Sequence, residues 1–371
     1  MPSMIIRLAA AWATVAAFLL IGDSLLGGLG QPVRAALVFA WLLGVIIWSA
    51  FGVVHEAEEL AHRLGEPYGT LILTLSIVII EVALIAAVML GAKGAPTLGR
   101  DTMFAVLMIV LNGVVGIGLL LGGLRHFQQH YNLKGATSYL AVIIPLTVIP
   151  LILPNFTSST PDGTLTSFQA VAFSLFTVAL YGSFLILQTG RHRMFFREPD
   201  PETGKPFDKP ASASPKEKNS ARAILPHVGL LLANILPIVI LSKSLAAVLD
   251  HGIAQLGAPV ALGGILIAMV VFTPECIAAL RAITANQLQR AINLCLGAAA
   301  STLGLTVPAV LTIGLITGQS VTLGLSPANM VLLAMTLLLS TLTFTGTRTT
   351  MLEGAVHLAV FFVYLVLVFS P

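Results

Sequence analysis

Charged residues are scarce in this chain. Only 9% of its 371 residues are Asp, Glu, Lys or Arg, whereas 57% are hydrophobic; soluble globular domains carry about 25% charged residues. A soluble core could not hide so much apolar surface, so we expect a membrane protein surrounded by lipid. The net charge of +3 is too small to indicate binding of nucleic acid, and we expect no such partner.

Cysteine is scarce as well. Cys276 and Cys295 lie in apolar segments without a CxxC spacing, which argues against a thiolate metal site or a disulfide framework. We interpret both as small buried hydrophobic residues. The sequence also contains no Walker motif for ATP. We therefore expect no cofactor and no ATP-driven process.

Long apolar runs fill most of the chain. A membrane-spanning helix needs about 20 apolar residues, and uninterrupted runs of this length exclude a transmembrane barrel, whose strands alternate. The first run has no clear cleavage site, so we interpret it as a helix rather than a signal peptide. The expected fold class is an all-α integral membrane protein with about eleven transmembrane helices. The predicted spans are residues 5–23, 34–54, 69–91, 102–124, 138–154, 167–188, 223–243, 258–280, 291–317, 327–345 and 350–369.

The distribution of basic residues predicts the orientation. With the N-terminus in the cytoplasm, fifteen of the nineteen Lys and Arg residues lie in cytoplasmic segments, as the positive-inside rule requires. This places the C-terminus outside and the protein in the cytoplasmic (inner) membrane. Residues 189–222 contain five prolines and charges of both signs, which predicts a flexible cytoplasmic linker.

The two halves that flank the linker resemble each other weakly. In each half an apolar run reaches a glutamate, Glu81 in the first and Glu275 in the second. An arginine follows, and twelve residues after it stands Asn112 in the first half and Thr302 in the second. The matching helices are five spans apart, an odd number, so the repeats must have opposite orientations. Inverted repeats are a common architecture of secondary transporters.

Glu81 and Glu275 are the two acidic residues that lie deep in predicted helices. The other fourteen acidic residues fall at predicted surfaces, helix ends or the linker; Glu56, Glu58, Glu59 and Glu66 are placed in the loop after the second span. An acidic side chain at a helix centre costs about 2.5–3.5 kcal/mol, and no Lys or Arg lies deep enough to pair with either glutamate. Each must be protonated, bind a cation or face water. A site that alternates between proton and cation is a cation/proton exchanger.

Further ligands can be proposed near each glutamate. Hard cations such as Ca²⁺ take several oxygen ligands, and Pro274 is expected to free a carbonyl one turn earlier, which we assign to Val271. Asn112, Ser301 and Thr302 could supply neutral oxygens. The same three side chains could equally form helix–helix hydrogen bonds. The threonines near the end of the tenth span are interpreted as packing or helix-end residues.

At these residues the chain resembles the calcium/cation antiporter superfamily, specifically its bacterial calcium/proton (sodium/proton) branch. The stretches HRLGEPYGTLILTLSIVIIEV and FTPE, with QLQRAINLCLG and LTVP, carry the resemblance. The resemblance implies one extra N-terminal helix and two inverted five-helix repeats. It divides the chain into the extra helix (1–30), the first repeat (31–188), the linker (189–222) and the second repeat (223–371).

The resemblance also implies a set of site residues. Relatives use a glutamate in the second helix of each repeat and the carbonyl oxygens one turn earlier. In this sequence these are Glu81 and Glu275 with the carbonyls of Ile77 and Val271. The polar residues of the third repeat helix map to Asn112 and to Ser301 or Thr302. Many relatives carry Gly-Asn just before each glutamate, where this chain has aliphatic and aromatic residues, which leaves room for Na⁺ or K⁺ as well as Ca²⁺.

We therefore expect a secondary antiporter that exports Ca²⁺ in exchange for protons by alternating access, with the lipid bilayer, cations and protons as its partners. The alternatives are a Na⁺/H⁺ or K⁺/H⁺ antiporter with little Ca²⁺ activity, and a passive cation channel. An enzyme is not expected. The histidines of HEAEELAH (55–62) are seven residues apart, unlike those of HExxH, and we interpret this stretch as a solvated amphipathic turn. The sequence leaves a homo-oligomer open.

Overall fold

The computed structural model describes residues 2–64, 68–90, 96–161, 163–199, 221–346 and 348–370. Almost all of them are helical, and ten helical segments are long and apolar enough to cross a membrane. An eleventh apolar helix, α12 (Pro327–Thr343), is shorter. Each of the eleven predicted spans coincides with one of these segments, so the predicted all-α membrane fold is confirmed.

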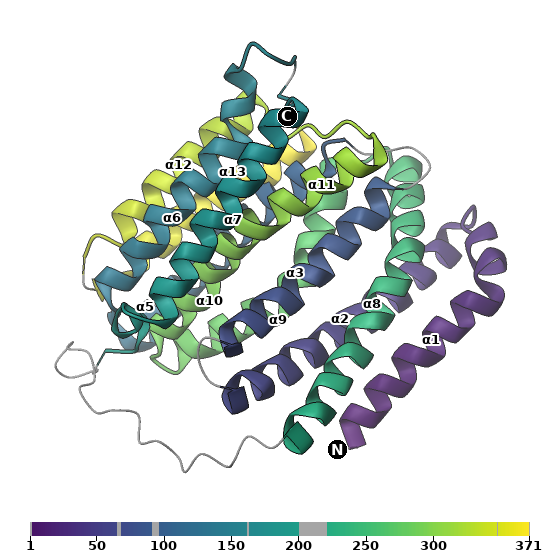
Figure 1. The fold of residues 1–371 in the computed structure, drawn as a ribbon, viewed down its shortest axis with the longest axis horizontal. Helices are drawn as coiled ribbons and strands as arrows, with labels where there is room; N and C mark the ends of the chain where they lie inside the picture. Colours follow the sequence, from purple (N-terminus) through teal and green to yellow (C-terminus); the bar gives the residue numbers. More distant parts are fainter. Residues whose placement is uncertain are drawn as a thin grey trace. The chain divides into compact units, whose positions relative to one another are not determined.

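Five helices contribute to the first of two compact units, which comprises Met1–Leu98 and Lys216–Pro274. Helix α2 packs against α8, α3 packs against both, and α1 packs on α2 and α8 (Figure 1). The helices are α1 (Pro2–Gly27), α2 (Pro32–Leu64), α3 (Tyr68–Met89), α8 (Ala221–Leu256) and the first part of α9 (Ala261–Thr284).

The second compact unit comprises Gly99–Pro215 and Glu275–Pro371. Helix α13 packs on α5 and on the π-helix before it, α11 packs on α7, and α10 packs on α6. The helices are α4 (Leu98–Leu107), π-helix η1 (Met108–Val114), α5 (Val115–His126), α6 (Leu133–Leu151), η2 (Leu153–Phe156), α7 (Ser167–Thr189), η3 (Arg193–Phe196), the rest of α9, α10 (Leu288–Ser301), π-helix η4 (Thr302–Thr306), α11 (Val307–Thr317), α12 and α13 (Met351–Phe369).

Side-chain caps and one short β-ladder define the ends of helices in this unit. Thr166 is the N-cap residue of α7 and Thr350 that of α13, each with a capping box that satisfies backbone N–H groups at the start of the helix. Strands β1 (Gln129–His130) and β2 (Arg348–Thr349) pair antiparallel just after α5 and just before α13. The ladder therefore ties the end of α5 to the start of α13.

Two predicted boundaries are wrong in the same way. Helix α2 continues to Leu64 rather than ending at residue 54, and α8 continues to Leu256 rather than 243. The stretch 55–64 is therefore helix and not a loop or turn. Its buried residues Glu56, Ala57 and Leu60 recur at helical spacing, so one face of this part of α2 is turned to the interior. The predicted loop residue Glu56 is thus only 1% exposed.

The predicted linker is only partly a free connection. Residues 200–220 lie outside the described residues, as does Glu66, but the first part of the stretch is folded. It forms the 3₁₀ turn η3, and the side chain of Asn293 on α10 donates to the carbonyl of Phe196 at 2.6 Å. The division of the chain into an extra helix, two repeats and a linker stays a prediction.

Candidate cation-binding site

Glu81 lies in the interior of α3, within the first unit. Its side chain is 0% exposed, with Ile80, Leu84 and Ile85 buried beside it. The helix is continuous from Tyr68 to Met89, so a regular backbone ladder commits the carbonyl of residue 77 to the N–H of residue 81. A ligand role for the carbonyl of Ile77 stays a prediction.

Glu275 lies near the middle of α9, at the start of the second unit's share of that helix. The helix runs to Thr284, four residues beyond the predicted end at 280, which places the glutamate deeper in the span than the sequence suggested. Its side chain is 7% exposed.

The carbonyl freed by Pro274 belongs to Val270 and not to Val271. Proline removes the hydrogen bond to the carbonyl four residues earlier, and the carbonyl of Val271 instead faces the N–H of Glu275. The assignment to Val271 made from the sequence was wrong by one residue on this point. A ligand role for Val271 stays a prediction.

The third helix of each predicted repeat contains a π-helix at the matching position. Asn112 lies in η1, Ser301 is the last residue of α10, and Thr302 begins η4. All three side chains are buried. The π-helix is rare and is frequently found at functional sites. The two π-helices lie at positions that the predicted repeat would match, and the repeat itself stays a prediction.

Asn112 is held by side chains from two other helices. Its Nδ2 donates to Thr336 Oγ1 of α12 at 2.8 Å, and its Oδ1 lies 3.1 Å from His357 Nδ1 of α13. His357 Nε2 lies 3.0 Å from Thr343 Oγ1 of α12. The helix–helix interpretation of Asn112 is therefore realised, whereas Ser301 donates to the carbonyl of Ala298 in its own helix.

His357 was missed in the sequence analysis, although a usable signal exists. The stretch AVHLAV places one ionisable residue in the middle of an apolar span, just as IVIIEVALI does for Glu81. The side chain is 0% exposed. Ionisable residues inside membrane helices face the protein interior and mark functional paths by default. Thr343, interpreted as a packing residue, is its partner.

A second polar cluster ties three helices of the first unit together. Glu56 Oε2 on α2 lies 2.8 Å from His227 Nδ1 on α8, and Arg7 Nε on α1 donates to Asn234 Oδ1 on α8 at 3.1 Å. A Cβ added to Gly52 would lie 2.3 Å from that Asn234 oxygen. The glycine therefore lets the arginine and asparagine meet across α2. Glu56 was wrongly assigned to a loop, because the mixed polar and apolar sequence of residues 55–62 is equally typical of a solvated turn and of an amphipathic helix end.

Outside the spans, two groups on the second unit have raised pKa values. Burial raises the pKa of Glu198, although the backbone N–H groups of Gln289 and Arg290, which donate to its carboxylate, act in the opposite direction. Burial, with the nearby Glu353 carboxylate, raises the pKa of the Tyr131 hydroxyl. Through these two hydrogen bonds Glu198, a residue of the predicted linker, caps the N-terminus of α10.

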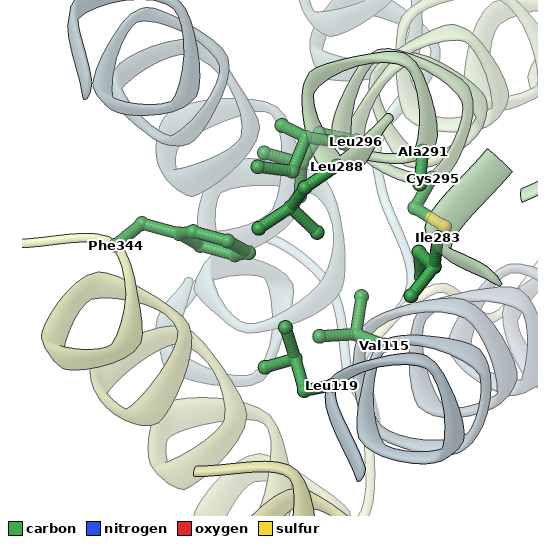
Figure 2. A pocket seen from close by; sticks show the side chains of 9 residues that line it. Val115, Leu119, Ile283, Leu288, Ala291, Cys295, Leu296 and Phe344 are labelled. Atoms are coloured by element: carbon green, nitrogen blue, oxygen red, sulfur yellow. The ribbon is translucent and has the colours of Figure 1, made fainter. Parts of the chain in front are cut away.

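One small pocket of the second unit is entirely apolar (Figure 2). Val115 and Leu119 of α5 face Leu296 of α10 across it, with Phe344 at one side and Cys295 in the lining. Both cysteines are free; Cys295 is buried, as interpreted from the sequence, whereas Cys276 is only partly buried, so for Cys276 that interpretation was wrong. The lining offers no oxygen ligand from a side chain, and the pocket is not a cation site.

These features define a helical membrane transporter with acidic residues buried in its spans. Residues 34–190 and 226–370 match the family described as "Sodium/calcium exchanger protein". The chain belongs to this family of membrane exchangers.

Individual relatives cover nearly the whole chain. The protein y4hA of Sinorhizobium fredii is 40% identical over 341 residues, covering 92% of this chain and 90% of the relative. The sodium-potassium/proton antiporter ChaA of Escherichia coli is 39% identical over 347 residues, covering 91% and 90%. The structure of native YfkE superposes with a TM-score of 0.73 at 17% identity, covering 99% of this chain and 100% of that one, which shows a shared fold.

Proposed function

We propose that this protein is a secondary antiporter that exports cytoplasmic cations in exchange for protons by alternating access. Glu81 and Glu275 are the carboxylates that take up a proton or bind the cation. The observation that carries the proposal is the burial of both glutamates inside membrane helices, at 0% and 7% exposure. Burial disfavours an ionised carboxylate, and a proton or a bound cation offsets that cost.

The choice of cation is supported from two directions. The sequence resemblance points to Ca²⁺, and two carboxylates balance one divalent ion. The similarity to the sodium-potassium/proton antiporter ChaA, together with the aliphatic Ile77-Val78 before Glu81, supports Na⁺ or K⁺. Ca²⁺/H⁺ exchange is the first candidate function and monovalent cation/H⁺ exchange is the second.

The proposed topology follows from the charge distribution. The protein lies in the cytoplasmic (inner) membrane with its N-terminus and residues 189–222 in the cytoplasm and its C-terminus outside. Fifteen of the nineteen basic residues then lie on the cytoplasmic side. Cysteine accessibility from each side of intact cells, at residue 3 and at residue 370, tests this orientation.

The test of function uses purified protein in sealed liposomes with an acidic lumen. Addition of CaCl₂, NaCl or KCl outside should dissipate the pH gradient in wild-type liposomes. Glu81→Gln and Glu275→Gln should reduce each response to the level of protein-free liposomes, because the amide cannot exchange a proton. The matched control is Glu59→Gln, which removes a half-exposed carboxylate of α2 that pairs with Arg63.

Two results would overturn the proposal. One is wild-type transport by both glutamine variants with retention of their folded elution profile. The other is cation flux through the wild type that needs no proton countermovement, which would indicate a channel rather than an exchanger.

A further inference from the structure

We propose that His357 is a positioning residue for cation transport and acts by fixing the side-chain amide of Asn112. The proposal rests on the proposed antiport function and concerns groups within the second unit alone. It identifies a residue of α13 that neither the repeat nor the resemblance pointed to.

Four side chains form an unbroken chain of hydrogen bonds. With the amide as the structure places it, Asn112 Oδ1 can only accept, so His357 Nδ1 carries the proton and donates to it. Thr343 then donates to the neutral His357 Nε2, while Asn112 Nδ2 donates to Thr336 Oγ1. All four side chains are at most 2% exposed. No solvent is at hand to replace a lost partner.

Two glycines allow α13 and α5 to approach closely near His357 and Asn112. A Cβ on Gly354, one turn before the histidine, would lie 2.7 Å from the carbonyl oxygen of Gly116. Gly116 itself lies one turn after Asn112, and a Cβ there would lie 2.9 Å from Leu358. Helices α13 and α5 therefore cross almost backbone to backbone at two glycines, as small residues allow in membranes.

The chemistry explains why this matters for a cation. An asparagine amide presents an oxygen on one side and an NH₂ group on the other, and only the oxygen can bind a cation. With His357 protonated on Nδ1, the oxygen of Asn112 accepts from the ring and its NH₂ group donates to Thr336, so this arrangement favours the amide orientation that the structure shows. The oxygen still has a second lone pair for a cation. This is how outer partners orient ligands in metal sites.

The π-helix makes the dependence stronger. Asn112 lies inside η1, where the wider turn departs from the regular ladder. The contact from His357 therefore reaches a side chain on the irregular turn itself.

The test measures how initial proton flux in liposomes depends on the concentration of CaCl₂, NaCl or KCl. His357→Leu should raise the apparent KM about 10-fold or more, the range found when outer-shell partners of metal ligands are removed, with a much smaller change in maximal rate. His357→Asn should recover most of the affinity, because its side-chain NH₂ group, bonded to Cγ as Nδ1 is, can donate to Asn112. Thr343→Val should cause a smaller rise in the same direction and remains informative if His357→Leu fails to fold.

Two controls separate positioning from general packing. Thr341→Val alters a hydroxyl of α12 that donates to the carbonyl of Leu337 in its own helix, and it should leave KM unchanged. In an Asn112→Ala background, His357→Leu should have almost no further effect, because its target is gone. Independent effects of the two substitutions on KM, or an unchanged KM for His357→Leu, would overturn the proposal.

Failure of this proposal is distinguishable from failure of the antiport function. If wild-type protein gives no cation-driven proton flux, the proposed function fails. If wild type transports, Glu81→Gln does not, and the His357 variants match wild type, then only the role of His357 is wrong.

Discussion

The contact between Glu56 and His227 should be among the strongest single polar interactions in the first unit. The carboxylate side chain is 2% exposed and the imidazole 22%, and the atoms lie 2.8 Å apart. A hydrogen bond that involves a charged group contributes about 1.5–3 kcal/mol, and burial keeps water from replacing it. We expect a coupling energy in this range from a double-mutant cycle of Glu56→Ala and His227→Ala.

The assay is the free energy of unfolding in mixed detergent micelles for wild type, both single variants and the double variant. The same cycle on Glu59 and Arg63 provides the matched control, because that pair also lies on α2 but is 42% and 34% exposed with atoms 3.9 Å apart. An exposed i, i+4 pair contributes about 0.2–0.5 kcal/mol. The buried pair should therefore exceed the control severalfold.

One result would refute this reasoning. If the coupling energy between Glu56 and His227 is no larger than that of the exposed pair, the contact between α2 and α8 does not depend on it. The burial of Glu56 would then reflect only the packing of its helix.

Two further predictions concern the second unit. Folding raises the pKa of Glu198 above its ordinary value of 4.5, so its favourable contribution to stability is complete below pH 4.5 and is lost as the pH rises through the raised value. The melting temperature of wild type, relative to that of Glu198→Gln, should therefore fall between pH 4 and pH 7. A rise over this range would contradict the sign of the pKa shift. Gly354→Leu should cost about 1–3 kcal/mol of unfolding free energy, because a Cβ at this position would lie 2.7 Å from the carbonyl oxygen of Gly116. Gly182→Leu should be tolerated, because a Cβ there meets nothing within 4 Å. Equal losses of stability would argue against the close crossing of α13 and α5.

Some features of the site were readable from the sequence because a membrane makes a local pattern decisive. An ionisable residue in a long apolar run is costly wherever the helix packs, so Glu81 and Glu275 could be selected as candidate site residues without a structure. His357 gave the same signal and was overlooked in favour of the acids. The helix lengths were less accessible, since amphipathic turns such as residues 55–64 continue a helix only when a neighbour buries one face.

The sequence by itself determined that this chain is a helical membrane protein, approximately where its spans lie and which glutamates interrupt them, because hydrocarbon penalises charge and unpaired backbone residue by residue. Only the tertiary structure decided which polar groups meet. The pairing of Glu56 with His227, and of Asn112 with His357, joins residues more than a hundred positions apart. Such contacts depend on how helices cross, and crossing depends on small residues such as Gly52 and Gly354, whose neighbours are set by packing and not by local pattern.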